Sequence, residues 1–213
     1  MIQIKNLTKR YGKLTVYENF SLELEEGKIT CILGESGCGK TTLLNCIAGL
    51  TDCEGEISKV KCSYIFQTPR LVPNLTVGGN LKLICKDETA VDEALAKVRL
   101  TDKKNAYPVA LSGGQAQRVS IARAFLYDGE VILMDEPFNS LDLKLKKEIS
   151  ELFLQIQNES RRTALFVTHD VDEALSLAHR IIAINGGKTV LDVLTEGVDK
   201  DELRKRLISV LIA

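Results

Sequence analysis

Hydrophobic and polar residues alternate along the first part of the chain, and the period changes after a glycine-rich segment. Residues 2–7 and 21–24 alternate as half-buried strands do, and 28–33 is a short apolar run. A loop rich in glycine then leads into residues 40–50, whose apolar positions have helical spacing that ends at Gly49. Strand, loop and helix in this order predict the opening of an α/β unit.

The rest of the chain alternates strand-like and helix-like segments around a region of different character. Residues 71–127 contain paired glycines and helical patterning and little that resembles a strand, so we expect a helical insertion there. Short apolar runs at 131–134, 164–167 and 180–184 predict buried strands. The other expected elements are an amphipathic helix over 145–156, a hairpin turn at 185–186, a strand over 188–193 and a helix over 199–212.

These elements predict an α/β fold with a mixed, mostly parallel sheet, an N-terminal antiparallel β region and an inserted helical subdomain. At 213 residues the chain is long enough for one well-buried core, and no repeat or linker marks a second independent domain. We therefore expect a single domain over 1–213, with its core in 1–70 and 129–213 and the helical subdomain in 71–128.

Composition and charge bear on the location and partners of the protein more than on its reaction. The chain is 45% hydrophobic and 27% charged with a formal net charge of −1, so no global field attracts nucleic acid or an acidic membrane. No apolar run approaches the roughly 20 residues needed to cross a bilayer. The alternating start favours a strand over a signal peptide, and we expect a cytoplasmic protein.

Six cysteines do not suggest a metal site. No Cys-x-x-Cys pair is present and the chain has two histidines, so zinc is disfavoured. Reduced, mostly buried thiols are the favoured interpretation. The cysteines are Cys31, Cys38, Cys46, Cys53, Cys62 and Cys85.

The glycine-rich segment fits the pattern G-x-x-x-x-G-K-[ST] between a strand and a helix, as a phosphate loop requires. Its residues are Gly34, Glu35, Ser36, Gly37, Cys38, Gly39, Lys40, Thr41 and Thr42. Glycines let backbone amides approach phosphate oxygens near a helix N-terminus, where the dipole favours anions. Lys40 can reach the β- and γ-phosphates, and the Thr41 hydroxyl can ligate Mg²⁺. The alternative is a glycine-rich turn without a ligand.

Cys38 lies inside this loop. A thiol near a positive helix end can have a lowered pKa, which makes oxidant sensitivity conceivable. A small residue tolerated at a variable position is the favoured interpretation.

Two acids follow the apolar run at 131–134. The C-terminal end of a central parallel strand is where α/β sheets place ligands. Asp135 can hold Mg²⁺ through water, while Glu136 can orient and deprotonate an attacking water. Such a pair alone is often a solvated turn, but together with the phosphate loop it predicts a nucleotide hydrolase.

A Ser-Gly-Gly turn precedes another helical stretch, at 111–115. Its backbone amides form a second potential anion site at a helix N-terminus. In isolation, Leu111-Ser112-Gly113-Gly114-Gln115 is more simply an N-capped helix after a loop.

In these residues, in their order and over nearly its whole length, the chain resembles the ATP-binding cassette (ABC) family. The resemblance implies a P-loop NTPase core. The phosphate loop resembles Walker A, 131–136 resembles Walker B, and 111–115 is identical to the family signature. Four shorter matches are Gln67 of the glutamine loop, Ser140-Leu141-Asp142 of the D-loop, His169 as the switch histidine, and Tyr11 as the aromatic that stacks on adenine.

The resemblance implies a head-to-tail pair of cassettes with shared sites. Each ATP would lie between the phosphate loop of one subunit and Ser112, Gly114 and Gln115 of the other, with Asp142 among its contacts. Glu136 would be the general base, with Lys40 and His169 on the γ-phosphate and Gln67 sensing the metal. Mg²⁺ would be held by Thr41, Gln67 and Asp135. Gln67 would also link the site to a helical subdomain that grips a membrane partner.

Each short match has a plainer alternative. Tyr11 could be a surface or core residue, Gln67 a solvated loop residue, and His169 a satisfied core histidine. His179 has no matching motif and is interpreted as structural.

Segments 66–77 and 135–142 resemble importer cassettes, nearest the nitrate, sulfonate and taurine branch. That likeness implies an ATPase, peripheral on the inner face of the cell membrane, with permease subunits and a solute-binding protein as partners. Gly78-Gly79 and Ala110 depart from the usual importer residues. The chain stops soon after the cassette, so we expect no regulatory C-terminal domain of the sugar-importer kind.

Two other functions remain open from the sequence. One is a soluble ABC ATPase acting on DNA or ribosomes. Such proteins usually have coiled-coil insertions, tandem cassettes or basic arms, and none appears in this sequence. A P-loop kinase should lack the signature and the switch histidine.

Overall fold

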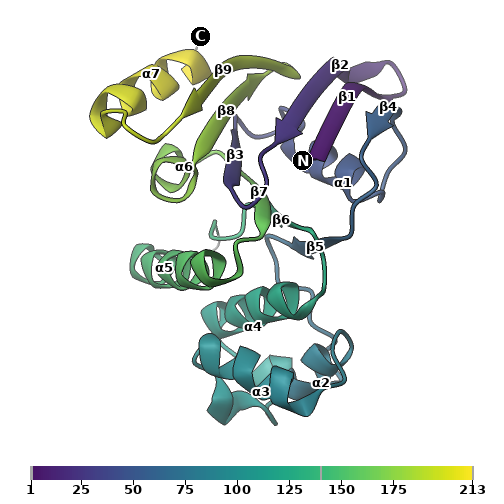
Figure 1. Cartoon of the computed structure of the whole chain (residues 1–213), viewed down its shortest axis with the longest axis vertical. Coiled ribbons are helices and arrows are strands. Elements are labelled where there is room, and N and C mark those ends of the chain that lie inside the picture. The colour runs from purple at the N-terminus through teal and green to yellow at the C-terminus, as the bar shows by residue number, and fades with distance from the viewer. Residues whose placement is uncertain (1, 140, 213) are drawn as a thin grey trace.

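Two sheets organise the part of the molecule that the computed structural model describes, residues 2–139 and 141–212 (Figure 1). The larger sheet has the order β5-β6-β7-β3-β8-β9, parallel except for β9. Its strands are β3 (Ile29–Leu33), β5 (Cys62–Ile65), β6 (Val131–Asp135), β7 (Thr163–Thr168), β8 (Arg180–Asn185) and β9 (Lys188–Leu194). An antiparallel sheet of order β2-β1-β4 is formed by β1 (Ile2–Tyr11), β2 (Leu14–Leu24) and β4 (Glu54–Ile57). The predicted α/β class, mostly parallel sheet and N-terminal antiparallel region are confirmed.

The central strands are apolar throughout because both of their faces are covered. In β6, Ile132 and Met134 belong to the core beneath α4 and α5, while Val131 and Leu133 belong to the core that contains α1 and the N-terminal sheet. Successive side chains of a strand point to opposite faces, so an unbroken apolar run is what such a strand requires.

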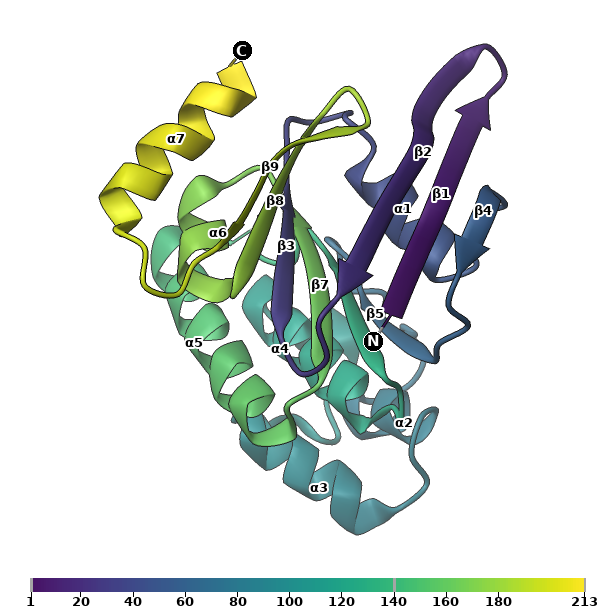
Figure 2. The same cartoon turned by 45° about the horizontal axis from the view of Figure 1, so that its top comes forward.

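Helices cover both faces, and three of them gather at one end of the molecule. Figures 1 and 2 both show α2, α3 and α4 on the side away from the N-terminal sheet, and all three lie between β5 and β6 in the chain. The helices are α1 (Lys40–Ile47), α2 (Val77–Lys82), α3 (Glu88–Lys97), α4 (Gly113–Leu126), α5 (Leu143–Ser160), α6 (Val171–Leu177) and α7 (Lys200–Ile212), with short 3-10 turns at Thr101–Lys103 and Pro108–Ala110. Among the described residues, no helix has the length and apolar character needed to span a membrane.

Parallel pairing brings the ends of three strands to one edge. Leu33 of β3 pairs with Thr168 of β7, and Asp135 of β6 pairs with Val167. The glycine-rich loop, the acidic pair and His169 therefore all leave the sheet at the same place, although they come from three separate parts of the sequence.

Two strands were not expected from the pattern. Most of β4 is exposed, so its residues Glu-Gly-Glu-Ile carry no apolar alternation. The four-residue β5 is short and lies at the sheet edge. β2 is also longer than the stretch 21–24, because bulges in its pairing with β1 interrupt the alternation.

Candidate active site

The glycine-rich loop has a backbone that only glycine adopts easily. It leaves β3 after Leu33 and turns into α1 through Gly37 and Gly39, whose φ angles of 84° and 106° are left-handed. A Cβ on Gly39 would lie 2.6 Å from a methyl carbon of Val16, so space as well as conformation requires glycine there. Gly34 is also tightly packed, since a Cβ would lie 2.8 Å from the Ile184 carbonyl oxygen.

Lys40 begins α1 with its charge almost wholly buried, 5% exposed. Its Nζ donates to the carbonyl oxygens of Gly34 and Glu35, both at 2.8 Å, and lies 3.7 Å from Oε1 of Glu136. A buried ammonium must be surrounded by such oxygens. The cation is thereby held between the loop and the acidic pair.

The two acids at the end of β6 have separate partners. Asp135 Oδ1 accepts a hydrogen bond from the Thr41 hydroxyl at 2.9 Å, and burial raises the pKa of Asp135. Glu136 has a φ of +43°, a strained conformation for a residue with a side chain. Its Oε2 accepts from the Asn139 amide at 2.8 Å. The carboxylates thus point to different groups, as the division of roles requires.

His169 lies one residue beyond β7, which pairs with β6. Its Nδ1 is 3.3 Å from Glu136 Oε1, and its side chain is 43% exposed. The ring therefore stands at the surface beside the strained glutamate and is not a core histidine.

A cavity of about 410 Å³ joins half of the predicted site residues, and His169, Gly34, Glu35 and Cys38 are not part of its lining. It is lined by Ser36, Gly37, Gly39, Lys40, Thr41, Thr42, Gln67, Asp135, Glu136 and Asn139. Asn139 was not singled out from the sequence. Its position three residues after Glu136 could have indicated it, because a side-chain amide in a turn can reach back to the carboxylate.

The residues of the Ser-Gly-Gly turn do not line this cavity. Ser112 is the exposed N-cap of α4 and forms a capping box with Gln115: its hydroxyl accepts from the Gln115 N–H at 3.3 Å, and Gln115 Oε1 accepts from the Ser112 N–H at 3.0 Å. A Cβ on Gly114 would lie 2.5 Å from a methyl carbon of Leu145. The capped-helix interpretation is correct for the isolated chain, and the turn faces outward.

Tyr11 and Asp142 also lie outside the cavity. Tyr11 ends β1, 49% exposed, with the Lys9 ammonium 4.6 Å from its ring centre. Asp142 caps α5 by accepting from the Leu145 N–H at 3.0 Å. Ser140, named with the D-loop, is outside the described residues.

A family model described as "ABC transporter" matches residues 17–139, more than half of the chain. The chain belongs to this family. It is similar to the aliphatic sulfonates import ATP-binding protein SsuB of Bacillus cereus (strain ZK / E33L), 42% identical over 196 residues that cover 85% of this chain and 78% of that protein. It is also similar to the spermidine/putrescine import ATP-binding protein PotA of Pseudomonas aeruginosa (strain UCBPP-PA14), 38% identical over 209 residues that cover 88% of this chain and 58% of that protein.

Among solved structures, this ABC protein is similar to a dimeric ATP-binding cassette in a post-hydrolysis state bound to ADP and Pi. The TM-score is 0.81 and the identity 31%, over 93% of this chain and all of that chain. The phosphate loop, the acidic pair and these relatives agree, and the chain is an ATP-binding and ATP-hydrolysing cassette.

The donor set of the ABC cavity fits Mg²⁺. The Thr41 hydroxyl, the Asp135 carboxylate and the Gln67 side-chain amide all line the same cavity, and hard oxygen donors of this kind are what Mg²⁺ takes from proteins. Burial raises the pKa of Asp135, whereas a bound cation would lower it and so favour the carboxylate that a metal ligand needs.

The thiol of Cys38 does not have the lowered pKa that a position near a helix N-terminus can give. The thiol is half-buried, and that burial raises the pKa although Lys40 lowers it. Desolvation therefore outweighs the cation and the helix end.

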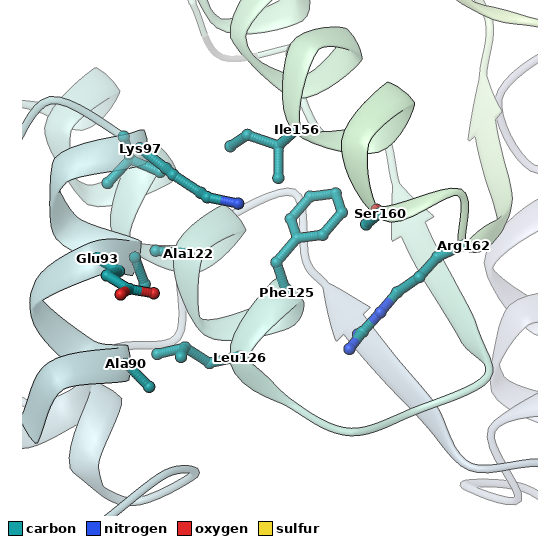
Figure 3. A pocket seen from close by; sticks show the side chains of 11 residues that line it. Ala90, Glu93, Lys97, Ala122, Phe125, Leu126, Ile156, Ser160 and Arg162 are labelled. Atoms are coloured by element: carbon teal, nitrogen blue, oxygen red, sulfur yellow. The ribbon is translucent and has the colours of Figure 1, made fainter. Parts of the chain in front are cut away.

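A second hollow of about 210 Å³ lies at the seam of α3, α4 and α5 and shares no residue with the ATPase cavity (Figure 3). Phe125 and Ile156 form part of its apolar lining, and Lys97 bridges its rim to Glu159 of α5 at 2.9 Å. This seam joins the helices between β5 and β6 to the core of the molecule.

Proposed function

We propose that this ABC ATPase is the motor subunit of an importer, in which two copies pair head to tail and drive separate membrane permease subunits. The observation that carries the proposal is the separation of the two anion-binding turns. The cavity holds the phosphate loop and both acids, while Ser112, Gly114 and Gln115 lie outside it at an exposed helix N-terminus. Two chains in a head-to-tail arrangement would place the second turn over the cavity of the first.

Within the shared site, each group has a physical task. The loop amides and Lys40 would bind the β- and γ-phosphates. Thr41, Asp135 and Gln67 would hold Mg²⁺, whose charge would neutralise the phosphate oxygens. Glu136 accepts the proton of the attacking water. Ser112, Gly114 and Gln115 of the second copy contact the γ-phosphate from the opposite side, and Tyr11 contacts adenine.

Asn139 and His169 hold the general base. The Asn139 amide is bonded to one oxygen of Glu136 and His169 stands beside the other. With both oxygens held, the carboxylate has one orientation toward the water. His169 is free to contact the γ-phosphate as well, because its ring is partly exposed.

The permease would contact the helical side of the molecule. Gln67 lines the cavity and directly follows the strand β5 and Phe66, at the start of the segment that leads to α2, α3 and α4. We infer that residues 71–128 move as a subdomain when this glutamine responds to the metal. The protein would then be peripheral at the inner membrane face, with a solute-binding protein supplying the permease.

The solute is not part of this proposal. One relative is named for the import of aliphatic sulfonates, which are anions, and the other for the import of spermidine and putrescine, which are cations. This chain is similar to both, which supports a motor whose membrane subunits contribute the selectivity.

The shared site is tested by mixing two inactive variants. Ser112→Arg disables the turn and Lys40→Ala disables the phosphate loop, so each homodimer has no working site. A mixed dimer keeps one site, and an equimolar mixture should recover about a quarter of wild-type turnover, since half of the dimers are mixed and each has one site of two. A mixture as inactive as its parts, or monomers that hydrolyse ATP at full rate, would contradict the head-to-tail model.

The partner class is tested by purification from membranes. Copurification of a polytopic membrane protein supports the importer. Recovery of nucleic acid in its place would support the soluble alternative and reject the importer.

A further inference from the structure

Tyr64 does not line the cavity, but its hydroxyl neighbours Asp135, one of the proposed metal ligands. It lies on β5, whose partner in β6 is Leu133, two residues before Asp135. Side chains two apart on a strand share a face. Tyr64 and Asp135 therefore project from neighbouring strands to the same side of the sheet, which is the side covered by α1.

Helix α1 presents two polar side chains to this pair. Thr41 and Asn45 are four residues apart, so they lie one turn apart on the same face of the helix. The Thr41 hydroxyl donates to Asp135 Oδ1 at 2.9 Å, and the Tyr64 hydroxyl donates to Asn45 Oδ1 at 3.3 Å. Burial raises the pKa of Tyr64, and the adjoining Asp135 carboxylate raises it further. The phenol oxygen thus lies beside both Asn45 and Asp135.

The ring of Tyr64 packs against Phe66, which in turn contacts Arg70. It stacks on Phe66 with 4.1 Å between ring centres and 14° between planes. The Arg70 guanidinium lies 3.8 Å from the centre of the Phe66 ring, and the Arg70 carbonyl oxygen accepts from Arg123 of α4 at 2.6 Å. The hydroxyl is therefore fixed by packing as well as by its own hydrogen bond.

We propose that Tyr64 is a positioning residue that orients the Asp135 carboxylate for Mg²⁺. This inference rests on the metal site of the proposed function. A hydroxyl has one proton and two lone pairs, so it can donate to Asp135 while accepting from the Asn45 amide turned about its last bond. Asp135 then has a donor on each side, Thr41 and Tyr64. Partners behind a metal ligand restrict its orientation, and their loss commonly costs about 10- to 100-fold in metal affinity.

Tyr64→Phe is the direct test, because it removes the hydroxyl and keeps the stacked ring. Tyr107→Phe is the matched control: it deletes a hydroxyl from an exposed tyrosine that does not line the cavity. Both changes are made in a Glu136→Gln background so that ATP is not consumed. The affinity for a fluorescent ATP analogue is measured in excess Mg²⁺ and in EDTA, and the ratio of the two affinities is the contribution of the metal.

Tyr64→Phe should lower this ratio about tenfold and leave the affinity in EDTA unchanged within about twofold, while Tyr107→Phe should change neither. With Glu136 intact, Tyr64→Phe should raise the Mg²⁺ concentration for half-maximal turnover and leave kcat at saturating Mg²⁺ within about twofold of wild type. A generally damaged fold would lower the affinity in EDTA as well, and that result would count against positioning.

Asp135→Asn separates the two ways of being wrong. If it abolishes the metal contribution and Tyr64→Phe does not reduce it, the metal site is correct and the role of Tyr64 is rejected. If Asp135→Asn also leaves the contribution of the metal intact, the metal assignment of the proposed function fails, and the role of Tyr64 fails with it.

Discussion

The phosphate-loop cavity and the signature turn are both glycine-containing helix N-termini, but they differ in what their side chains contact. In the cavity, Lys40 is buried against loop carbonyls and Glu136, and Thr41 is bonded to Asp135. At the turn, the side chains of Ser112 and Gln115 accept hydrogen bonds from each other's backbone N–H groups, and Ser112 is exposed. The cavity has a hydrogen bond and an ion pair between residues far apart in sequence, whereas the side-chain hydrogen bonds of the turn are local.

The difference shows which part of the ATPase site a single chain can build. Long-range bonds between residues far apart in sequence require the sheet to be formed, so the cavity is a product of the fold. A capping box needs only its own four residues. The capping box uses the backbone N–H groups of Ser112 and Gln115, and it leaves those of Gly113 and Gly114 for a ligand brought by another molecule.

The largest effect is expected from the general base. Glu136→Gln keeps the shape and the bond from Asn139 but removes the proton acceptor, so turnover should fall by at least about a hundredfold while ATP binding is retained. Steady-state phosphate release and equilibrium nucleotide binding measure the two quantities. Turnover near the wild-type value would show that Glu136 is not the general base, and the phosphate-loop cavity would then lack one.

The two histidines provide a matched pair for the next effect. His169 Nδ1 is 3.3 Å from Glu136 Oε1, whereas His179 Nδ1 accepts a hydrogen bond from the N–H of Ile29, which begins β3 at the end opposite to the phosphate loop, at 3.0 Å. His169→Ala should lower turnover by about tenfold to a hundredfold with little change in melting temperature. His179→Ala should lower the melting temperature and leave turnover per folded molecule nearly unchanged. The reverse pattern would make His169 the structural histidine.

A pair of helix caps tests the outward-facing turn. Ser112 caps α4, and the Thr76 hydroxyl caps α2 by accepting from the Gly79 N–H at 3.0 Å. Each change to alanine should reduce the free energy of unfolding by about 1 kcal/mol. Only Ser112→Ala should also reduce turnover, by about tenfold, because a hydrogen bond to a charged phosphate is lost in the dimer. Chemical denaturation and turnover at dimer-forming concentrations measure both effects. Equal turnover in the two variants would leave the turn as a cap and nothing more.

Much of the phosphate-loop cavity could be predicted from the sequence. The strand, loop and helix around Lys40 follow from local pattern, and the parallel order that brings Asp135 and His169 beside them follows from the rules of α/β sheets. Asn139 and Tyr64 could not be found in this way. Each acts through a hydrogen bond whose geometry depends on a strained turn or a sheet-edge strand, and β5 itself was too short to give a pattern.

The pKa of Cys38 could not be predicted for a related reason. The helix end and Lys40 are visible in the sequence and both favour the thiolate, but the burial that outweighs them comes from the packing of the loop. Local motifs therefore indicate which charges are near a group, while its solvation is decided by the folded chain.

The smallest effect is expected at this thiol. It tests whether burial or the positive end of α1 dominates the pKa of a group in the phosphate loop. A raised pKa means that less thiolate is present at neutral pH, so Cys38 should react with iodoacetamide more slowly than a free thiol, at a rate that keeps rising above pH 9. Site-resolved mass spectrometry distinguishes it from the other five cysteines. Cys38→Ser should keep turnover within about twofold of wild type. Rapid alkylation at pH 7 would mean that the helix end and Lys40 outweigh burial after all, and that the loop is more open to solvent than its close packing indicates.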